Sequence, residues 1–160
     1  GTMNNFVYGN EVYQNYETIC GGTGAGDGFH GTSAVHSHMT NTRMTDPEVF
    51  EARFPVMLEA FTIDRGSGGR GRFCAGDGVT RRISFLEDME CSILSDRRRV
   101  AAPGLNGGEA GRLGRNTIAR AEGTEEDLGG SGEARVAAGD SVVIQTPTGG
   151  GFGPVSERSA

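Results

Sequence analysis

The sequence predicts a mainly β domain (α+β, with one short helix) in which glycine-rich loops join antiparallel strands. Segments rich in β-branched and aromatic residues recur along the chain, and clusters of glycine separate them. Glycine accounts for 28 of the 160 residues, against about 7% in an average globular chain. We interpret the clusters as loops with tight turns that need positive φ, because glycine adopts that conformation without steric cost.

The first strands are expected within residues 3–19, where aromatic and β-branched side chains mix with turn-forming Asn and Gly. A glycine-rich loop follows at 21–28, and the segment after it shows no helical period. We expect a short helix after Thr45, predicted here as its N-cap, because Pro47 suits the first helical turn. Pro55 ends this helix.

Six further strands complete the predicted fold. They are expected at 56–64, 79–86, 90–96, 116–121, 133–137 and 141–146. The tripeptide at 138–140 is expected to turn the last two strands into a hairpin or a short corner. The predicted domain covers 1–154, and a polar tail at 155–160 is expected to fray.

The charged residues exclude several classes of function. All 15 basic residues are arginine, so the chain contains no Walker-type phosphate loop, no Schiff-base lysine and no lysine general base. The net charge is −6, which argues against a nucleic-acid partner. No apolar run reaches the roughly 20 residues that cross a bilayer, so no membrane partner is predicted. Three widely spaced cysteines indicate a reducing compartment, and we expect a cytoplasmic protein.

The three histidines of the chain lie close together, at His30, His36 and His38. On an extended segment His36 and His38 point to the same side, which suits two metal ligands, and His30 or Asp46 could complete the set. The same imidazoles could instead transfer protons or contact a substrate. They could also order a glycine-rich loop by hydrogen bonding. The spacing leaves these three interpretations open.

Two other patterns involve anion recognition. Residues 26–31 match G-x-G-x-x-G, but no amphipathic helix follows, as a dinucleotide site requires, so we interpret them as turns. Arginines at 97–99 end a predicted strand, and a guanidinium there can bind a carboxylate or phosphate through two hydrogen bonds. Arg43 has the same capacity within the histidine segment. Internal ion pairs are the expected role of most other arginines.

Six blocks of the sequence, taken in order, form a further pattern. They read GTMNNFVYG, YETICGGTGAGDGFHG, HSHMTNTRMTDPEVFEARFPV, RGSGGRGRFCAGDGV, LSDRRR followed by PGLNGGEAG, and GDSVVIQTPTGGGFGP. Together these blocks resemble the hydantoinase B/5-oxoprolinase family, and specifically the C-terminal portion of its B-type subunit. The resemblance extends to about Pro154. It implies that the chain begins inside a longer B portion.

The resemblance implies a function. The chain would be the C-terminal part of an ATP-dependent cyclic amidohydrolase that opens the ring of 5-oxoproline or of a hydantoin. ATP and Mg would act through a hydantoinase A-type subunit or domain, and this chain itself would bind no cofactor. The N-terminal part of the B portion would be a second partner, the small cyclic amide would be the substrate, and the isolated fragment would be inactive.

The resemblance also assigns a site. His36 and His38 match motif positions that are expected to be catalytic, through proton transfer. His30, Asn41 and Arg43 match positions that are expected to bind the substrate. Whether the chain binds a divalent metal and whether it forms a homo-oligomer stay open. So do two other functions: a non-catalytic remnant that forms a subunit interface, and a small metal-binding β-domain centred on the two catalytic candidates.

Overall fold

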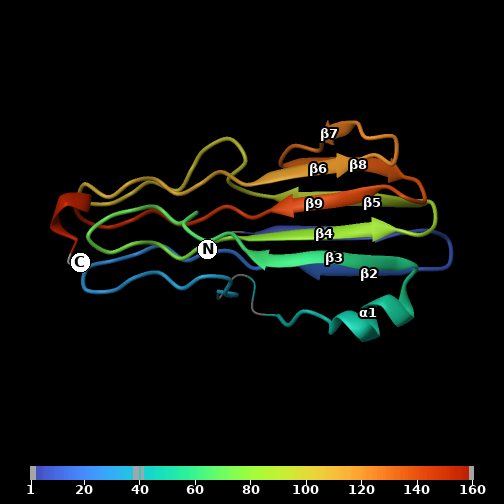
Figure 1. Ribbon diagram of the computed structural model, residues 1–160, viewed down its shortest axis with the longest axis horizontal. Helices are drawn as coiled ribbons and strands as arrows, with labels where there is room; N and C mark the ends of the chain where they lie inside the picture. Colours follow the sequence, from blue (N-terminus) through green and yellow to red (C-terminus); the bar gives the residue numbers. More distant parts are fainter. Residues whose placement is uncertain (1–2, 38–39, 41, 159–160) are drawn as a thin grey trace.

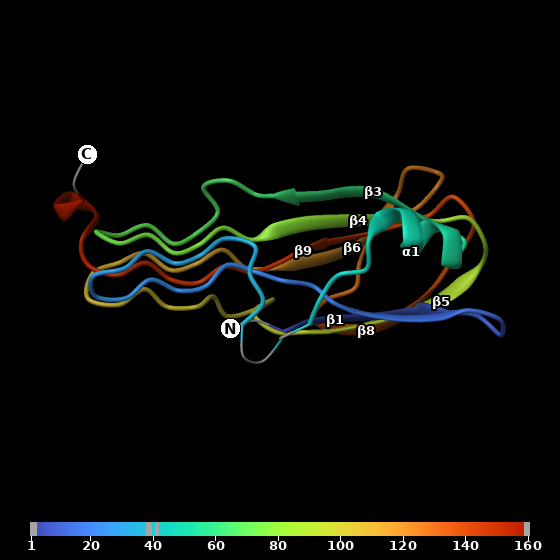
Figure 2. The same ribbon diagram turned by 90° about the horizontal axis from the view of Figure 1, so that it is seen from below.

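The computed structural model describes residues 3–37, 40 and 42–158, in which the strands form two stacked antiparallel sheets (Figures 1 and 2). The first sheet has the order β2-β1-β5-β8 and consists of β1 (Asn4–Gly9), β2 (Gln14–Thr18), β5 (Met89–Ser95) and β8 (Ser131–Val136). The second has the order β3-β4-β9-β6-β7 and consists of β3 (Val56–Ile63), β4 (Val79–Phe85), β9 (Ser141–Gln145), β6 (Arg115–Ala119) and β7 (Glu125–Asp127). One short helix, α1 (Pro47–Arg53), packs beside β3. The predicted fold class is confirmed.

Three local features differ from the sequence prediction. The N-cap of α1 is Asp46 and not Thr45, because the Asp46 carboxylate accepts a hydrogen bond from the Glu48 backbone N–H at 3.0 Å. Strand β7 was not expected, since its three acidic, exposed residues show no apolar alternation. In the C-terminal tail, Val155–Glu157 forms a 3-10 turn, η1.

The turn at 138–140 forms a corner between the sheets. Strands β8 and β9 do not pair with each other, because β8 belongs to the first sheet and β9 to the second. Gly139 adopts a φ of 95° there, which requires glycine in practice. Of the two predicted arrangements, the hairpin is wrong and the corner is correct.

The hydrophobic core lies between the two sheets. Alternate residues of β1 face it, so that Phe6 and Tyr8 are almost fully buried. Tyr8 packs edge-on against Phe85 of β4, with ring centroids 5.4 Å apart. Phe50 of α1 approaches Tyr8 in the same way at 6.4 Å. The helix therefore closes one side of the core by burying a single aromatic ring.

A buried ion pair joins the two sheets on the side of α1. Arg81 of β4 donates to both carboxylate oxygens of Glu17 of β2, at 2.9 and 2.8 Å. The two side chains are only 1% and 6% exposed. The Arg81 guanidinium also lies 5.4 and 5.1 Å from the ring centroids of Phe50 and Phe61. Charge pairing and aromatic contacts thus hold β2, β4 and α1 together.

The glycine-rich segments extend beyond one end of the sheets and run side by side there (Figures 1 and 2). We call this group of extended segments the glycine bundle. Residues 146–151 form a buried central segment in this glycine bundle. Backbone hydrogen bonds tie it to neighbouring segments: Ala25 N to Gly150 O, Gly69 N to Gly149 O, Leu105 N to Gly151 O and Gly151 N to Glu109 O. The bundle therefore satisfies its backbone groups between segments that are distant in sequence.

Consecutive glycines of the central segment face different neighbours. A Cβ added at Gly149 would lie 2.3 Å from the nearest atom of residues 23–24. A Cβ at Gly150 would lie 2.0 Å from residues 103–104, and one at Gly151 would lie 2.1 Å from residues 69–70. Three neighbours in three successive residues are what an extended helix with three residues per turn produces. None of these three glycines is among those with positive φ. The interpretation as tight turns is therefore wrong here, and close backbone approach is the reason for glycine.

We expect Gly150→Ala to lower the free energy of unfolding by about 1–3 kcal/mol or more, the cost of forcing atoms into a packed interior. Its Cβ would meet a backbone carbonyl, Pro103 O, that cannot rotate away. Gly24→Ala is the matched control, because its Cβ would have only Gly150 O near it, at an ordinary 3.7 Å. Denaturant unfolding of both variants measures the difference. Equal stability of the two would show that the bundle does not depend on close approach.

Within the described parts of the chain, the structure shows no helix of the length and apolarity that crossing a membrane requires.

Candidate functional site

The chain turns out of the glycine bundle immediately before the histidine segment. Ala34 has a φ of 51°, a left-handed conformation that is uncommon and strained for any residue except glycine. Two backbone hydrogen bonds hold this turn, from Ala34 N to Asp77 O at 3.0 Å and from Val35 N to Gly21 O at 2.9 Å. The position of His36 is therefore fixed on its N-terminal side by contacts with two other segments.

The His36 imidazole is half-buried and unpaired. Neither ring nitrogen makes a hydrogen bond of good geometry to a described residue, although both are shielded from solvent. Burial lowers the pKa of His36 from its ordinary value of 6.5, and the Thr40 backbone acts weakly in the opposite direction. A neutral imidazole offers one donor and one acceptor, so this ring can take up or deliver a proton.

After His36 the segment folds back on itself. Ser37 N donates to Thr40 Oγ1 at 3.1 Å, and Thr40 N donates to Ser37 O at 3.0 Å. Arg43 follows on the surface, and its guanidinium makes no ion pair or hydrogen bond to any residue that the structure describes. His38 and Asn41, the other two candidates in this segment, lie outside the described residues.

His30 lies on the glycine bundle. Its Nδ1 accepts a hydrogen bond from the Cys74 backbone N–H at 2.9 Å, and its ring packs edge-on against Phe73, with centroids 5.5 Å apart. Because Nδ1 is the acceptor, the proton of the neutral ring is on Nε2. No hydrogen bond or ring contact among the described residues joins His30 to His36 or Arg43. The three are therefore not joined by direct contacts within the described part of the chain.

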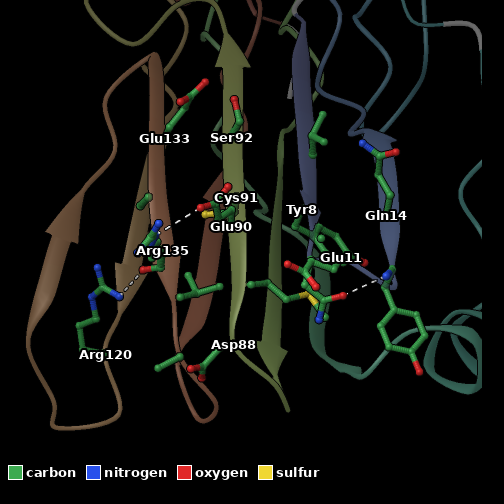
Figure 3. A pocket seen from close by; sticks show the side chains of 18 residues that line it. Tyr8, Glu11, Gln14, Asp88, Glu90, Cys91, Ser92, Arg120, Glu133 and Arg135 are labelled. Atoms are coloured by element: carbon green, nitrogen blue, oxygen red, sulfur yellow. Dashed lines mark hydrogen bonds and ion pairs between the residues drawn. The ribbon is translucent and has the colours of Figure 1, made fainter.

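The described residues provide no group of three His, Cys, Asp or Glu side chains that could hold a metal ion. A broad hollow of about 1180 Å³ does lie on the first sheet, but none of the three described candidates, His30, His36 and Arg43, lines it. Figure 3 shows Glu90 and Arg135 paired within it, at 3.3 Å, beside Ser92 and Glu133. Two of its charged side chains, Glu90 and Arg135, are thus already paired with each other.

Sequence reasoning missed two features next to His36. No sequence signal marks Ala34 as left-handed, because alanine rarely adopts that conformation. The Oγ of Ser37 is buried and has no partner among the described residues, which no sequence pattern indicates. A buried hydroxyl without a partner is costly unless a ligand or another chain supplies one. Ser37 therefore joins His36 as an unpaired polar group in this segment.

We expect the His36 ring to titrate below pH 6.5 when its proton resonances are followed by NMR, because burial disfavours the charged form. Between the folded pKa of His36 and pH 6.5 the unfolded chain binds more protons than the folded one. The contribution of His36 to the free energy of unfolding is therefore fully present above pH 6.5 and is lost as the pH falls through the folded pKa. His36→Gln should remove that part of the pH dependence. A titration midpoint at or above 6.5 would contradict the described burial.

Comparison with protein families gives one match that covers nearly the whole chain: the family described as hydantoinase B/oxoprolinase matches residues 1–155. A 5-oxoprolinase of Dictyostelium discoideum is 48% identical over 153 residues, which cover 96% of this chain and 12% of that protein. 5-Oxoprolinase 1 of Arabidopsis thaliana is also 48% identical, and the match again covers 96% of this chain and 12% of that protein. The chain thus spans about an eighth of the length of these curated relatives.

A solved structure shares the fold. The crystal structure of the ATP-dependent caprolactamase from Pseudomonas jessenii superposes with a TM-score of 0.79 at 20% sequence identity. The match covers 98% of this chain and 29% of that one. The two stacked sheets and the glycine bundle together therefore correspond to one part of a larger known architecture.

Proposed function

Because the chain belongs to the hydantoinase B/oxoprolinase family, we propose that it is part of an ATP-dependent enzyme that opens the ring of a cyclic amide. The observation that carries this proposal is the 48% identity to two 5-oxoprolinases over 96% of the chain. 5-Oxoproline is accordingly the first substrate to consider, and a hydantoin is the second. Both rings contain the amide bond that must be broken.

Within this proposal His36 transfers a proton during ring opening. Its half-buried, neutral imidazole, whose nitrogens have no hydrogen-bond partner of good geometry among the described residues, supports that role. Arg43, exposed and without a partner among the described residues, binds the carboxylate of the substrate. His38 is proposed as a second proton-transfer group, and Asn41 and His30 as substrate contacts. For His30 the group that remains available is Nε2–H.

ATP and its Mg are assigned to a hydantoinase A-type partner and not to this chain. The turn at 26–31 does not fit a phosphate site, because Gly26 and Phe29 exchange backbone hydrogen bonds at 3.2 and 3.3 Å and no helix follows. The chain also contains no lysine to contact a phosphate. The chemistry that ATP supplies is activation of the amide, and the residues described above act on the substrate itself.

The proposal is tested by producing the complete B-type protein that contains this chain together with its A-type partner. We expect ATP-dependent formation of glutamate from 5-oxoproline, or of a carbamoyl amino acid from a hydantoin. The 160-residue chain alone should neither hydrolyse ATP nor open either ring. An assembly that is folded and hydrolyses ATP but opens no cyclic amide would overturn the proposal.

A further inference from the structure

Arg98 differs from the other arginines that lie largely inside the molecule. Arg81, Arg112 and Arg120 each contact a carboxylate, at Glu17, Asp64 and Asp140 respectively. In the part of the chain that the structure describes, no carboxylate forms an ion pair with Arg98. Its guanidinium instead donates to neutral oxygens: Asn4 Oδ1 at 2.6 Å, Asn116 Oδ1 at 2.7 Å and the Asp96 carbonyl at 2.8 Å.

The positive charge of Arg98 is therefore only partly compensated. Burial lowers the pKa of the guanidinium to about 10, and the Asp96 carboxylate nearby offsets a part of this shift. Arg98 is still protonated at neutral pH. Amide and carbonyl oxygens accept hydrogen bonds from its two terminal nitrogens, whereas Nε is buried and has no partner among the described residues. None of these contacts neutralises the charge, and buried charges in proteins are ordinarily paired with an opposite charge.

Two more arginines line the same place. Arg98, Arg99 and Arg115 surround a hollow of about 410 Å³, and Asp127 is the one acidic residue that lines it. The Asp127 carboxylate already accepts a hydrogen bond from the Gly129 backbone N–H at 2.7 Å. Arg99 contacts no acidic side chain among the described residues. Among the residues that line the hollow, three cations and one carboxylate give a net positive charge, and the carboxylates of Asp96 and Glu125 lie outside this lining.

Arg115 forms only a weak ion pair, with Glu125. Glu125 lies 3.5 Å away, and both side chains are more than half exposed. Ion pairs at such surface positions contribute only about 0–1 kcal/mol, so an anion that reaches several guanidinium groups at once displaces Glu125 easily. Arg115 is thus available to a ligand in the hollow.

Glycine shapes the wall of the hollow. The Arg98 guanidinium lies against Gly114, where an added Cβ would be 2.7 Å from its Cζ. Gly130 adjoins the stem of the same side chain, with its added Cβ 3.6 Å from Arg98 Cβ. A larger residue at Gly114 would push the guanidinium away from Asn4 and Asn116. The backbone therefore holds this buried cation in one place.

We propose that the hollow formed by Arg98, Arg99 and Arg115 binds a small oxyanion, either a carboxylate or a phosphate group. Guanidinium groups recognise both through pairs of parallel hydrogen bonds. A hollow of this size is within the range of small-molecule sites. The site shares no residue with the histidine segment and does not depend on the proposed ring-opening function.

Titration of the 160-residue chain with inorganic phosphate and, separately, with glutarate tests this site. The backbone amide resonances of Gly114, Gly129 and Gly130 report binding by NMR. We expect saturable shifts with at least one of the two probes, and the tighter probe identifies phosphate or carboxylate as the preferred group. Added NaCl should weaken binding, because the interaction is electrostatic.

The double variant Arg99→Ala/Arg115→Ala should weaken binding at least about tenfold, since it removes two of the three charge-assisted donors. Arg98 itself is kept, because it holds Asn4 and Asn116. The matched control is Arg65→Ala/Arg158→Ala, which removes two exposed arginines elsewhere and should leave the affinity within about twofold. Shifts that do not saturate with either probe, or equal affinities of the two double variants, would overturn the proposal.

Discussion

Replacing His36 with alanine is expected to lower the rate of ring opening by about 10²–10⁴-fold in the assembled enzyme, the usual contribution of a general acid–base group. The described fold should persist, because neither ring nitrogen makes a hydrogen bond of good geometry to a described residue. We expect the loss in kcat, whereas Arg43→Ala should mainly raise KM, since it removes a contact to the substrate carboxylate. Steady-state kinetics at saturating ATP separate the two effects.

Thr42→Ala is the matched control for these variants. It changes an exposed side chain in the same segment, whose hydroxyl makes only a long 3.5 Å contact to the Arg43 carbonyl. Thermal unfolding of all three variants shows whether folding is affected. Near-normal turnover of a folded His36→Ala enzyme would assign this histidine to a structural role.

Replacing Glu17 with alanine is expected to lower the free energy of unfolding by about 3–5 kcal/mol, because the change leaves a buried guanidinium without its counter-charge. Arg81 is 1% exposed and is enclosed by the rings of Phe50 and Phe61, so water cannot solvate it in place of the carboxylate. A loss of this size is a large fraction of the stability of a small domain. Denaturant unfolding measures it.

Two controls separate charge pairing from packing. The double variant Glu17→Leu/Arg81→Met removes both charges and should recover most of the loss, because apolar residues of similar volume often replace a buried pair without cost. Glu90→Ala breaks the pair with Arg135, whose side chains are 75% and 88% exposed, and should cost only about 0–1 kcal/mol. Equal effects of Glu17→Ala and Glu90→Ala would contradict the inferred role of burial.

The strands could be predicted because enrichment in β-branched and aromatic residues is a local property of the sequence. In β1, however, Phe6, Val7 and Tyr8 are all apolar, so composition predicts the strand but not which of its side chains enter the core. The glycine bundle could not be predicted in the same way. The need for glycine at Gly150 arises from Pro103, 47 positions earlier in the chain, and no local pattern encodes that approach.

The candidate site rests on the family resemblance, and the roles of its residues stay predictions. The resemblance singled out His36 and Arg43, and the structure describes both as unpaired with other described residues. It could not place His30 on the bundle, because that position depends on the hydrogen bond with Cys74, 44 residues away. The pairing of Glu17 with Arg81 likewise joins two sheets whose stacking no short segment specifies.

The ratio of ring-opened product to ADP, measured for the His36→Ala assembly and the unaltered assembly under the same conditions, tests the central claim most directly. ATP use is assigned to the A-type partner and ring opening to the chain described here. Loss of His36 should therefore stop product formation more completely than ATP hydrolysis, and the ratio should fall well below that of the unaltered enzyme. An unchanged ratio would contradict the account, because it would show that this segment takes no separate part in opening the ring.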